Sequence, residues 1–120
     1  MIEYKNLEVW KKSIQLVKET YMLIAKLPDV ERYALADQIR RAVISIPANI
    51  AEGNGRGSDK ENIKFLGYSK GSLFELETEL IICIELGYFT KEQTEKIFIL
   101  LGDISRMLNG FIKKIKQDVQ

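Results

Sequence analysis

Apolar residues recur at alternating steps of three and four along most of the chain, and this periodicity constrains the fold more than any other feature. Such spacing gathers apolar side chains on one side of an α-helix. Four segments show it, with seams at Leu7, Trp10, Ile14, Val17, Tyr21 and Ile24; Leu35, Ile39, Ala42, Ile46 and Ile50; Leu66, Ser69, Leu73, Leu76, Leu80 and Cys83; and Ile97, Leu101, Ile104, Leu108, Phe111 and Ile115. Residues 74–80 alternate like a strand, but they are rich in glutamate and poor in β-branched residues. The sequence therefore predicts an all-α protein.

Turn and capping residues separate the four segments. They predict helices at about 7–27, 30–53, 59–86 and 91–117. The expected N-terminal caps are Asn6, Asp29, Ser58 with Glu61, and Thr90 with Gln93. Short connections between long helices favour antiparallel neighbours. We therefore expect one domain over residues 1–120, folded as an antiparallel up-down-up-down four-helix bundle.

The composition excludes several kinds of chemistry. The 120 residues contain no histidine and one cysteine, Cys83, and the net charge is +1. Zinc sites of Cys and His, His-based catalysis and an internal disulfide are therefore excluded. The glycine-rich stretch at 53–57 lacks the lysine spacing of a Walker motif. We expect no catalytic residues, no metal and no cofactor, and hence a protein that is not an enzyme.

The sequence also lacks signals for export or membrane insertion. The first ten residues contain two acids and no apolar core, unlike a secretory signal. The longest apolar runs, at 80–84 and 97–101, are far shorter than the ~20 residues of a membrane span. A cytoplasmic protein without membrane contact is expected.

A register can be predicted for the second and third helices. If the chain reverses at Gly55 and Arg56, Ser45 faces Gly67 and Ala42 lies close to Gly71. A mid-helix glycine costs about 1 kcal/mol relative to alanine, and close contact between the helices would offset that cost. A ligand at these small residues is the alternative.

The same register brings arginine and glutamate together. It places Arg40 and Arg41 within about one turn of Glu75 and Glu77, which predicts salt bridges that fix the register or a subunit contact. Solvated surface charges are the alternative. Pro47 lies inside the second helix and predicts a kink, or backbone carbonyls freed for a partner.

One stretch of the sequence is distinctive as a whole. Residues 37–56 read DQIRRAVISIPANIAEGNGR, and GSLFELETEL follows at 71–80, after the opening YKNLEVWKKS at 4–13. Together they resemble bacterial four-helix-bundle proteins first noticed as reading frames in intervening sequences of large-subunit ribosomal RNA genes. The accessory protein of diversity-generating retroelements looks like a relative. The positions that match the signature are Arg41, Ser45, Pro47, Asn49, Glu52, Gly53, Arg56, Gly71, Ser72, Glu75 and Glu77.

The resemblance implies a homo-oligomer, with pentamers as the arrangement associated with the family. It also implies an association with nucleic acid and no established catalytic activity. Independent support for assembly comes from the third helix, which carries more apolar residues than one seam needs. These additional residues are Phe65, Tyr68, Phe74, Ile81, Ile82 and Ile84. Apolar surface of this extent typically marks an interface.

Two functions remain open for such an assembly. The first is a scaffold that binds RNA or DNA through basic clusters, with contacts at Arg40, Arg41, Arg56, Lys60 and Lys64. Further basic groups are Lys113, Lys114 and Lys116 near the end of the chain, and Lys11, Lys12 and Lys18. A net charge of +1 is low for nucleic-acid binding, although a ring would concentrate one face of every subunit. The second function is a protein adaptor, which would use an apolar or acidic patch such as the 75–85 segment.

Overall fold

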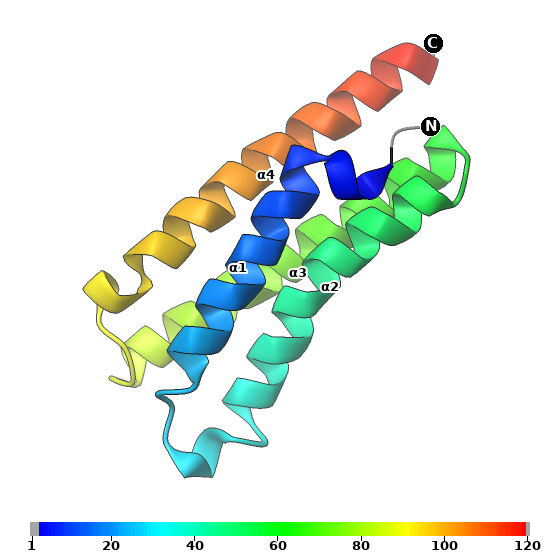
Figure 1. Cartoon of the computed structure of the whole chain (residues 1–120). Coiled ribbons are helices and arrows are strands. Elements are labelled where there is room, and N and C mark those ends of the chain that lie inside the picture. Colours follow the sequence, from blue (N-terminus) through cyan, green and yellow to red (C-terminus); the bar gives the residue numbers. More distant parts are fainter. Residues whose placement is uncertain (1–2, 120) are drawn as a thin grey trace.

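The computed structural model describes residues 3–119, which form four helices arranged around one core (Figure 1). The helices are α1 (Glu8–Ile24), α2 (Leu35–Gly55), α3 (Asp59–Glu85) and α4 (Lys91–Val119). Short 3-10 helices lie at Tyr4–Asn6 and Asp29–Glu31, and the described residues form no strand. Consecutive helices run antiparallel and are neighbours in space, and α4 also packs against α1. The all-α prediction and the four-helix bundle are confirmed.

Two of the four expected caps form as predicted. The Ser58 hydroxyl accepts a hydrogen bond from the Glu61 amide at 3.1 Å, and α3 begins directly after it. At α4 the Gln93 amide donates to the Thr90 hydroxyl at 3.1 Å, while the Thr90 amide donates to Oε1 of Gln93 at 2.9 Å. Each pair satisfies amides that have no partner within the helix.

The other two predicted caps do not form. Residue Leu7, rather than Asn6, precedes α1, without a side-chain cap. Asp29 opens a short 3-10 helix, so α2 begins only at Leu35 instead of near residue 30. Helix α1 also ends at Ile24, earlier than expected, because Leu27 and Pro28 belong to the connection. An isolated Asn or Asp is thus a weaker signal than a pair with capping-box spacing.

The buried residues of α2, α3 and α4 largely follow the predicted seams, whereas those of α1 follow a different line. The predicted seam of α3, from Leu66 to Cys83, is entirely buried. On α1 the buried line instead runs through Val9, Ser13, Leu16, Thr20 and Leu23. The predicted Tyr21 is exposed. Because the buried Ser13 and Thr20 are polar, a search for apolar residues alone does not identify the buried side of α1.

Helices α2 and α3 make the most extensive contact in the bundle. A Cβ added to Gly53 would lie 2.8 Å from Cβ of Phe65 and 2.9 Å from Oδ1 of Asn62. The buried hydroxyl of Ser69 donates to the carbonyl oxygen of Ile46 at 2.9 Å. The register is therefore shifted by about three residues from the prediction, because α2 continues to Gly55 and the positive φ of the turn falls at Gly57.

Candidate functional site

The predicted contact between Gly67 or Gly71 and α2 is wrong. Both glycines are exposed on the outer side of α3, and a Cβ at either would meet nothing within 4 Å. Ser45, expected opposite Gly67, bonds within its own helix, where its hydroxyl donates to the Ala42 carbonyl at 2.7 Å. Ala42 itself is buried in the core. The glycines that seemed to serve packing inside the bundle thus border open space.

The outer side of α3 carries a second stripe with helical spacing. Gly67, Gly71, Phe74, Thr78 and Ile81 follow one another at steps of four and three, and all are exposed. Tyr68 and Ile82 are exposed beside this stripe, and Phe74 keeps 57% of its surface accessible. We call these seven residues the outer face of α3. One helix therefore presents apolar surface on two opposite sides, one facing the core and one facing solvent.

The predicted cross-helix salt bridges do not form among the described residues. Nη2 of Arg41 lies 2.9 Å from a carboxylate oxygen of Asp37, and Nη2 of Arg40 lies 3.9 Å from the same side chain. Arg40 also donates to the carbonyl oxygen of Arg32 at 3.0 Å. Glu75 is exposed and Glu77 is half-buried. These arginines are thus neutralised within α2 rather than by α3.

The remaining predicted cations gather at the opposite end of α2. Arg56 pairs with Glu52 at 2.9 Å, and its guanidinium lies 4.9 Å from the centre of the Phe65 ring. Nζ of Lys64 is 4.0 Å from Glu61, and Lys60 is exposed. Fifteen residues of helix separate Arg41 from Arg56, a distance of about 23 Å. The five predicted contacts thus form two groups, and four of the five cations have a carboxylate partner.

The other signature positions on α2 occupy three different environments. Pro47 and Gly53 are buried, whereas Ser45 and Asn49 are half-buried. The Asn49 amide donates to the Ser45 carbonyl at 2.8 Å. Glu52 is exposed and is held by Arg56. Part of the signature thus serves the fold, and its polar edge lies at the surface beside α3.

A basic groove lies between α3 and the last turns of α4. Its volume is about 370 Å³, and its lining residues are Lys70, Asn109, Ile112, Lys113, Lys116 and Gln117. We call it the α3–α4 groove. Within residues 3–119, none of its three lysines forms an ion pair. Lys113 and Lys116 belong to a basic group seen in the sequence, but Lys70 does not, because only the packing of α3 on α4 brings it to them.

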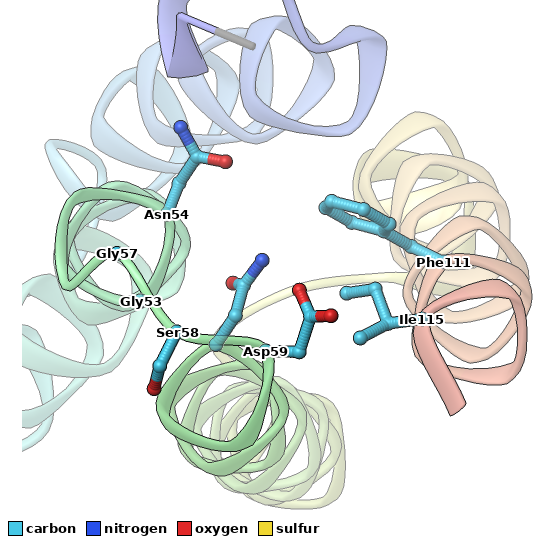
Figure 2. Close-up of a pocket in the computed structure, with 8 residues that line it drawn as sticks. Gly53, Asn54, Gly57, Ser58, Asp59, Phe111 and Ile115 are labelled. Atoms are coloured by element: carbon cyan, nitrogen blue, oxygen red, sulfur yellow. The ribbon is translucent and has the colours of Figure 1, made fainter. Parts of the chain in front are cut away.

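Another pocket lies where the α2–α3 turn faces α4, and it holds about 290 Å³ (Figure 2). Asp59 points into it from the start of α3, and Phe111 and Ile115 face it from α4 (Figure 2). Oδ1 of Asn62, which also lines it, is buried without a hydrogen-bond partner. Among the described residues that line it, Asp59 is the one charged group, and its carboxylate disfavours a phosphate in the pocket.

One acid on α3 is buried, and in the sequence it stands four residues after Glu75, a spacing that carboxylate metal ligands can have. Glu79 is 5% exposed, and its Oε1 has no hydrogen-bond partner. Burial, with a smaller contribution from the charge of Glu75, raises the pKa of Glu79 to about 7. Burial also raises the pKa of Cys83, one turn further along α3, to about 11. A thiol with so high a pKa is protonated at neutral pH and is a poor nucleophile.

No cluster of three or more metal-binding side chains occurs among residues 3–119. No helix in this part of the chain has the length and apolar character to cross a bilayer.

Comparisons with known proteins identify a family and a related crystal structure. Residues 5–110 match the family described as 23S rRNA-intervening sequence protein. A crystal structure from Bacteroides thetaiotaomicron, described as a protein with unknown function from the S23 ribosomal protein family, superimposes with a TM-score of 0.78. It is 28% identical, and the alignment covers 88% of this chain and 98% of that one. No protein with a curated description matches the chain.

Proposed function

Because the chain belongs to the family of 23S rRNA-intervening sequence proteins, we propose that it is a non-enzymatic homo-oligomeric scaffold that binds RNA or DNA. The observation that carries this proposal is the outer face of α3, an exposed apolar stripe on a helix whose other side is already buried. The family name refers to ribosomal RNA, and the related crystal structure is described as having unknown function. Neither the family nor the related protein is described as an enzyme.

A second copy of this chain is the occupant that best explains the outer face of α3. Gly67 and Gly71 each cost about 1 kcal/mol in a helix interior, and nothing within the subunit offsets that cost. Glycine on an exposed stripe allows the backbone of another helix to approach closely. Phe74 and Ile81 continue the stripe and would bury their exposed surface in the same contact.

A closed ring requires two different complementary patches on each subunit. The outer face of α3 supplies one of them. Exposed apolar residues away from α3 are available for the other, namely Tyr21 and Met22 on α1 and Ile99 on α4. The pentamer implied by the family resemblance is compatible with this arrangement.

The assembly is tested by Phe74→Glu, which places a charge at the centre of the stripe. We expect sedimentation velocity to show the wild-type chain as an oligomer and this variant as a monomer. Val30→Glu is the matched control, because Val30 is even more exposed but lies in the connection between α1 and α2. An oligomer that survives Phe74→Glu, or dissociates equally with Val30→Glu, would contradict the proposed interface.

Nucleic-acid binding is tested separately, with labelled single-stranded RNA and duplex DNA titrated by fluorescence anisotropy. Phosphate contacts release counterions, so affinity should fall steeply as salt rises. Absence of binding to both probes even at low salt would refute this part of the proposal and leave the assembly untouched.

A protein adaptor is the second candidate. Exposed Glu75 and Glu85 accompany Ile82 on α3 and Leu86 directly after the helix, which leaves an acidic and apolar surface for another protein. Partners recovered from the native host that survive nuclease treatment would favour this function. Partners lost with nuclease would favour the nucleic-acid scaffold.

A further inference from the structure

We propose that the α3–α4 groove is the nucleic-acid site and that it holds the phosphate backbone of an RNA strand through Lys70, Lys113 and Lys116. This inference rests on the proposed nucleic-acid function and assigns it to residues outside the five cations that the sequence singles out.

Most of the cations that the sequence singles out are already paired with a carboxylate. Each of Arg40, Arg41, Arg56 and Lys64 has a carboxylate of its own helix within 4.0 Å. A phosphate that approaches one of them must compete with that carboxylate. Within residues 3–119, the three lysines of the α3–α4 groove have no such competitor.

The α3–α4 groove is elongated along α4. Asn109, Lys113, Lys116 and Gln117 follow one another along one side of α4 and extend over about 12 Å. Lys70 faces them from α3. Since each nucleotide of a strand carries one phosphate charge, a row of this length can contact more than one of them. The groove therefore suits a chain of phosphates better than a single phosphate ion.

The groove combines lysines with the side-chain amides of Asn109 and Gln117. The two side-chain amides can donate to phosphate oxygens, or to sugar hydroxyls, which RNA provides and DNA lacks. Ile112 adds apolar surface to the lining. The end of α4 also carries the negative pole of the helix, which alone would favour lysines there, but Lys70 lies in the middle of α3. The macrodipole therefore does not account for the whole cluster.

The test replaces all three lysines by glutamate and measures anisotropy with a labelled 30-nucleotide single-stranded RNA. We expect affinity at low salt to fall on the order of 100-fold, and the salt dependence to lose about two units of slope. The matched control is Lys5→Glu with Lys26→Glu and Lys91→Glu, which changes the net charge equally at exposed lysines elsewhere. The conservative variant, with arginine at positions 70, 113 and 116, should bind as the wild type does. Circular dichroism melts verify that every variant is folded.

Three outcomes would overturn the assignment. If the groove variant binds as tightly as the wild type, the site is elsewhere, and the proposed function stands. If the control variant loses as much affinity as the groove variant, binding depends on net charge and not on this groove. If the wild type binds no RNA, both this inference and the RNA part of the proposed function fail. Duplex DNA of equal length and phosphatidylserine vesicles serve as parallel probes, and tighter binding to either than to RNA would refute the choice of RNA.

Discussion

On its inner side α3 meets α2 so closely that Gly53 has no room for a side chain, whereas on its outer side Gly67 and Gly71 border open space. The inner contact is complete within one subunit, since Ser69 is buried and bonded to the carbonyl of Ile46. The outer face has the same helical spacing but no partner in the subunit.

The difference teaches that helical periodicity identifies the core side of α3 but does not tell whether a second stripe on the opposite side also has a partner in the subunit. Both stripes look like packing surfaces in the sequence. The subunit uses one of them, and we propose that assembly uses the other. The comparison can be tested by changes on each side, measured in the Phe74→Glu background so that assembly does not alter the apparent stability.

The largest effect is expected from Gly53→Ala. The new Cβ would lie 2.8 Å from Cβ of Phe65 and 3.2 Å from the Asn62 carbonyl, so the two helices must separate. Overpacking should outweigh the gain in helix propensity and lower the free energy of unfolding by about 2 kcal/mol. Urea denaturation measures this change. Unchanged or increased stability would show that α2 and α3 are not in close contact there.

The next effect concerns pH and Glu79, the buried acid of α3. Its pKa is about 7 in the folded chain and about 4.5 in the unfolded one, so the folded state retains its proton to higher pH. The contribution of Glu79 to the free energy of unfolding should be full below pH 4.5, fall as pH rises to about 7, and then level off, with a loss on the order of 1–2 kcal/mol. Glu79→Gln should remove this pH dependence of the free energy of unfolding, and the variant should be more stable than the parent at pH 8.

The control for this prediction is Glu85→Gln, on the exposed surface of the same helix. If Glu85→Gln flattens the pH profile as much as Glu79→Gln, the slope arises from the charge of the surface and not from the buried carboxyl.

A smaller effect is expected from Ser69→Ala. The variant loses the 2.9 Å hydrogen bond to the Ile46 carbonyl inside the α2–α3 contact. The free energy of unfolding should fall by about 1 kcal/mol. Ser72→Ala, at a half-buried position without such a bond, is the comparison for helix propensity. Equal stability of the two variants would mean that the buried bond contributes little.

The smallest effect on the subunit, and the most informative, is expected from Gly71→Ala. Because nothing lies within 4 Å of the added Cβ, the monomer should gain about 0.5–1 kcal/mol of stability. In the wild-type background the same methyl group should weaken assembly, which dilution series by sedimentation would detect. A stabilised monomer with unchanged assembly would place Gly71 outside the interface.

Much of the fold was predictable because local signals agreed. The seam of α3 is buried as predicted, and the paired caps Ser58–Glu61 and Thr90–Gln93 form. The register of α2 on α3 was not predictable, since residues 53, 55 and 57 are all glycines and any of them could adopt the positive φ that Gly57 adopts. The expected contacts of Gly67 and Gly71 with α2 do not form, because both glycines lie on the side of α3 opposite its buried seam.

The candidate site was less predictable than the fold. The sequence does show that Arg41 and Arg56 are basic, but a carboxylate one turn away neutralises each of them. Lys70 is isolated in the sequence, and only packing brings it to Lys113 and Lys116. Pairing within a helix and proximity between helices therefore decide which cations are available to a ligand.

Light scattering on the purified wild-type chain tests the central claim most directly, because that claim assigns the outer face of α3 to a second copy of the chain. The account predicts a molar mass that is a multiple of 13.8 kDa, with five copies as the number implied by the family resemblance. A mass of 13.8 kDa that does not change with concentration would contradict the account.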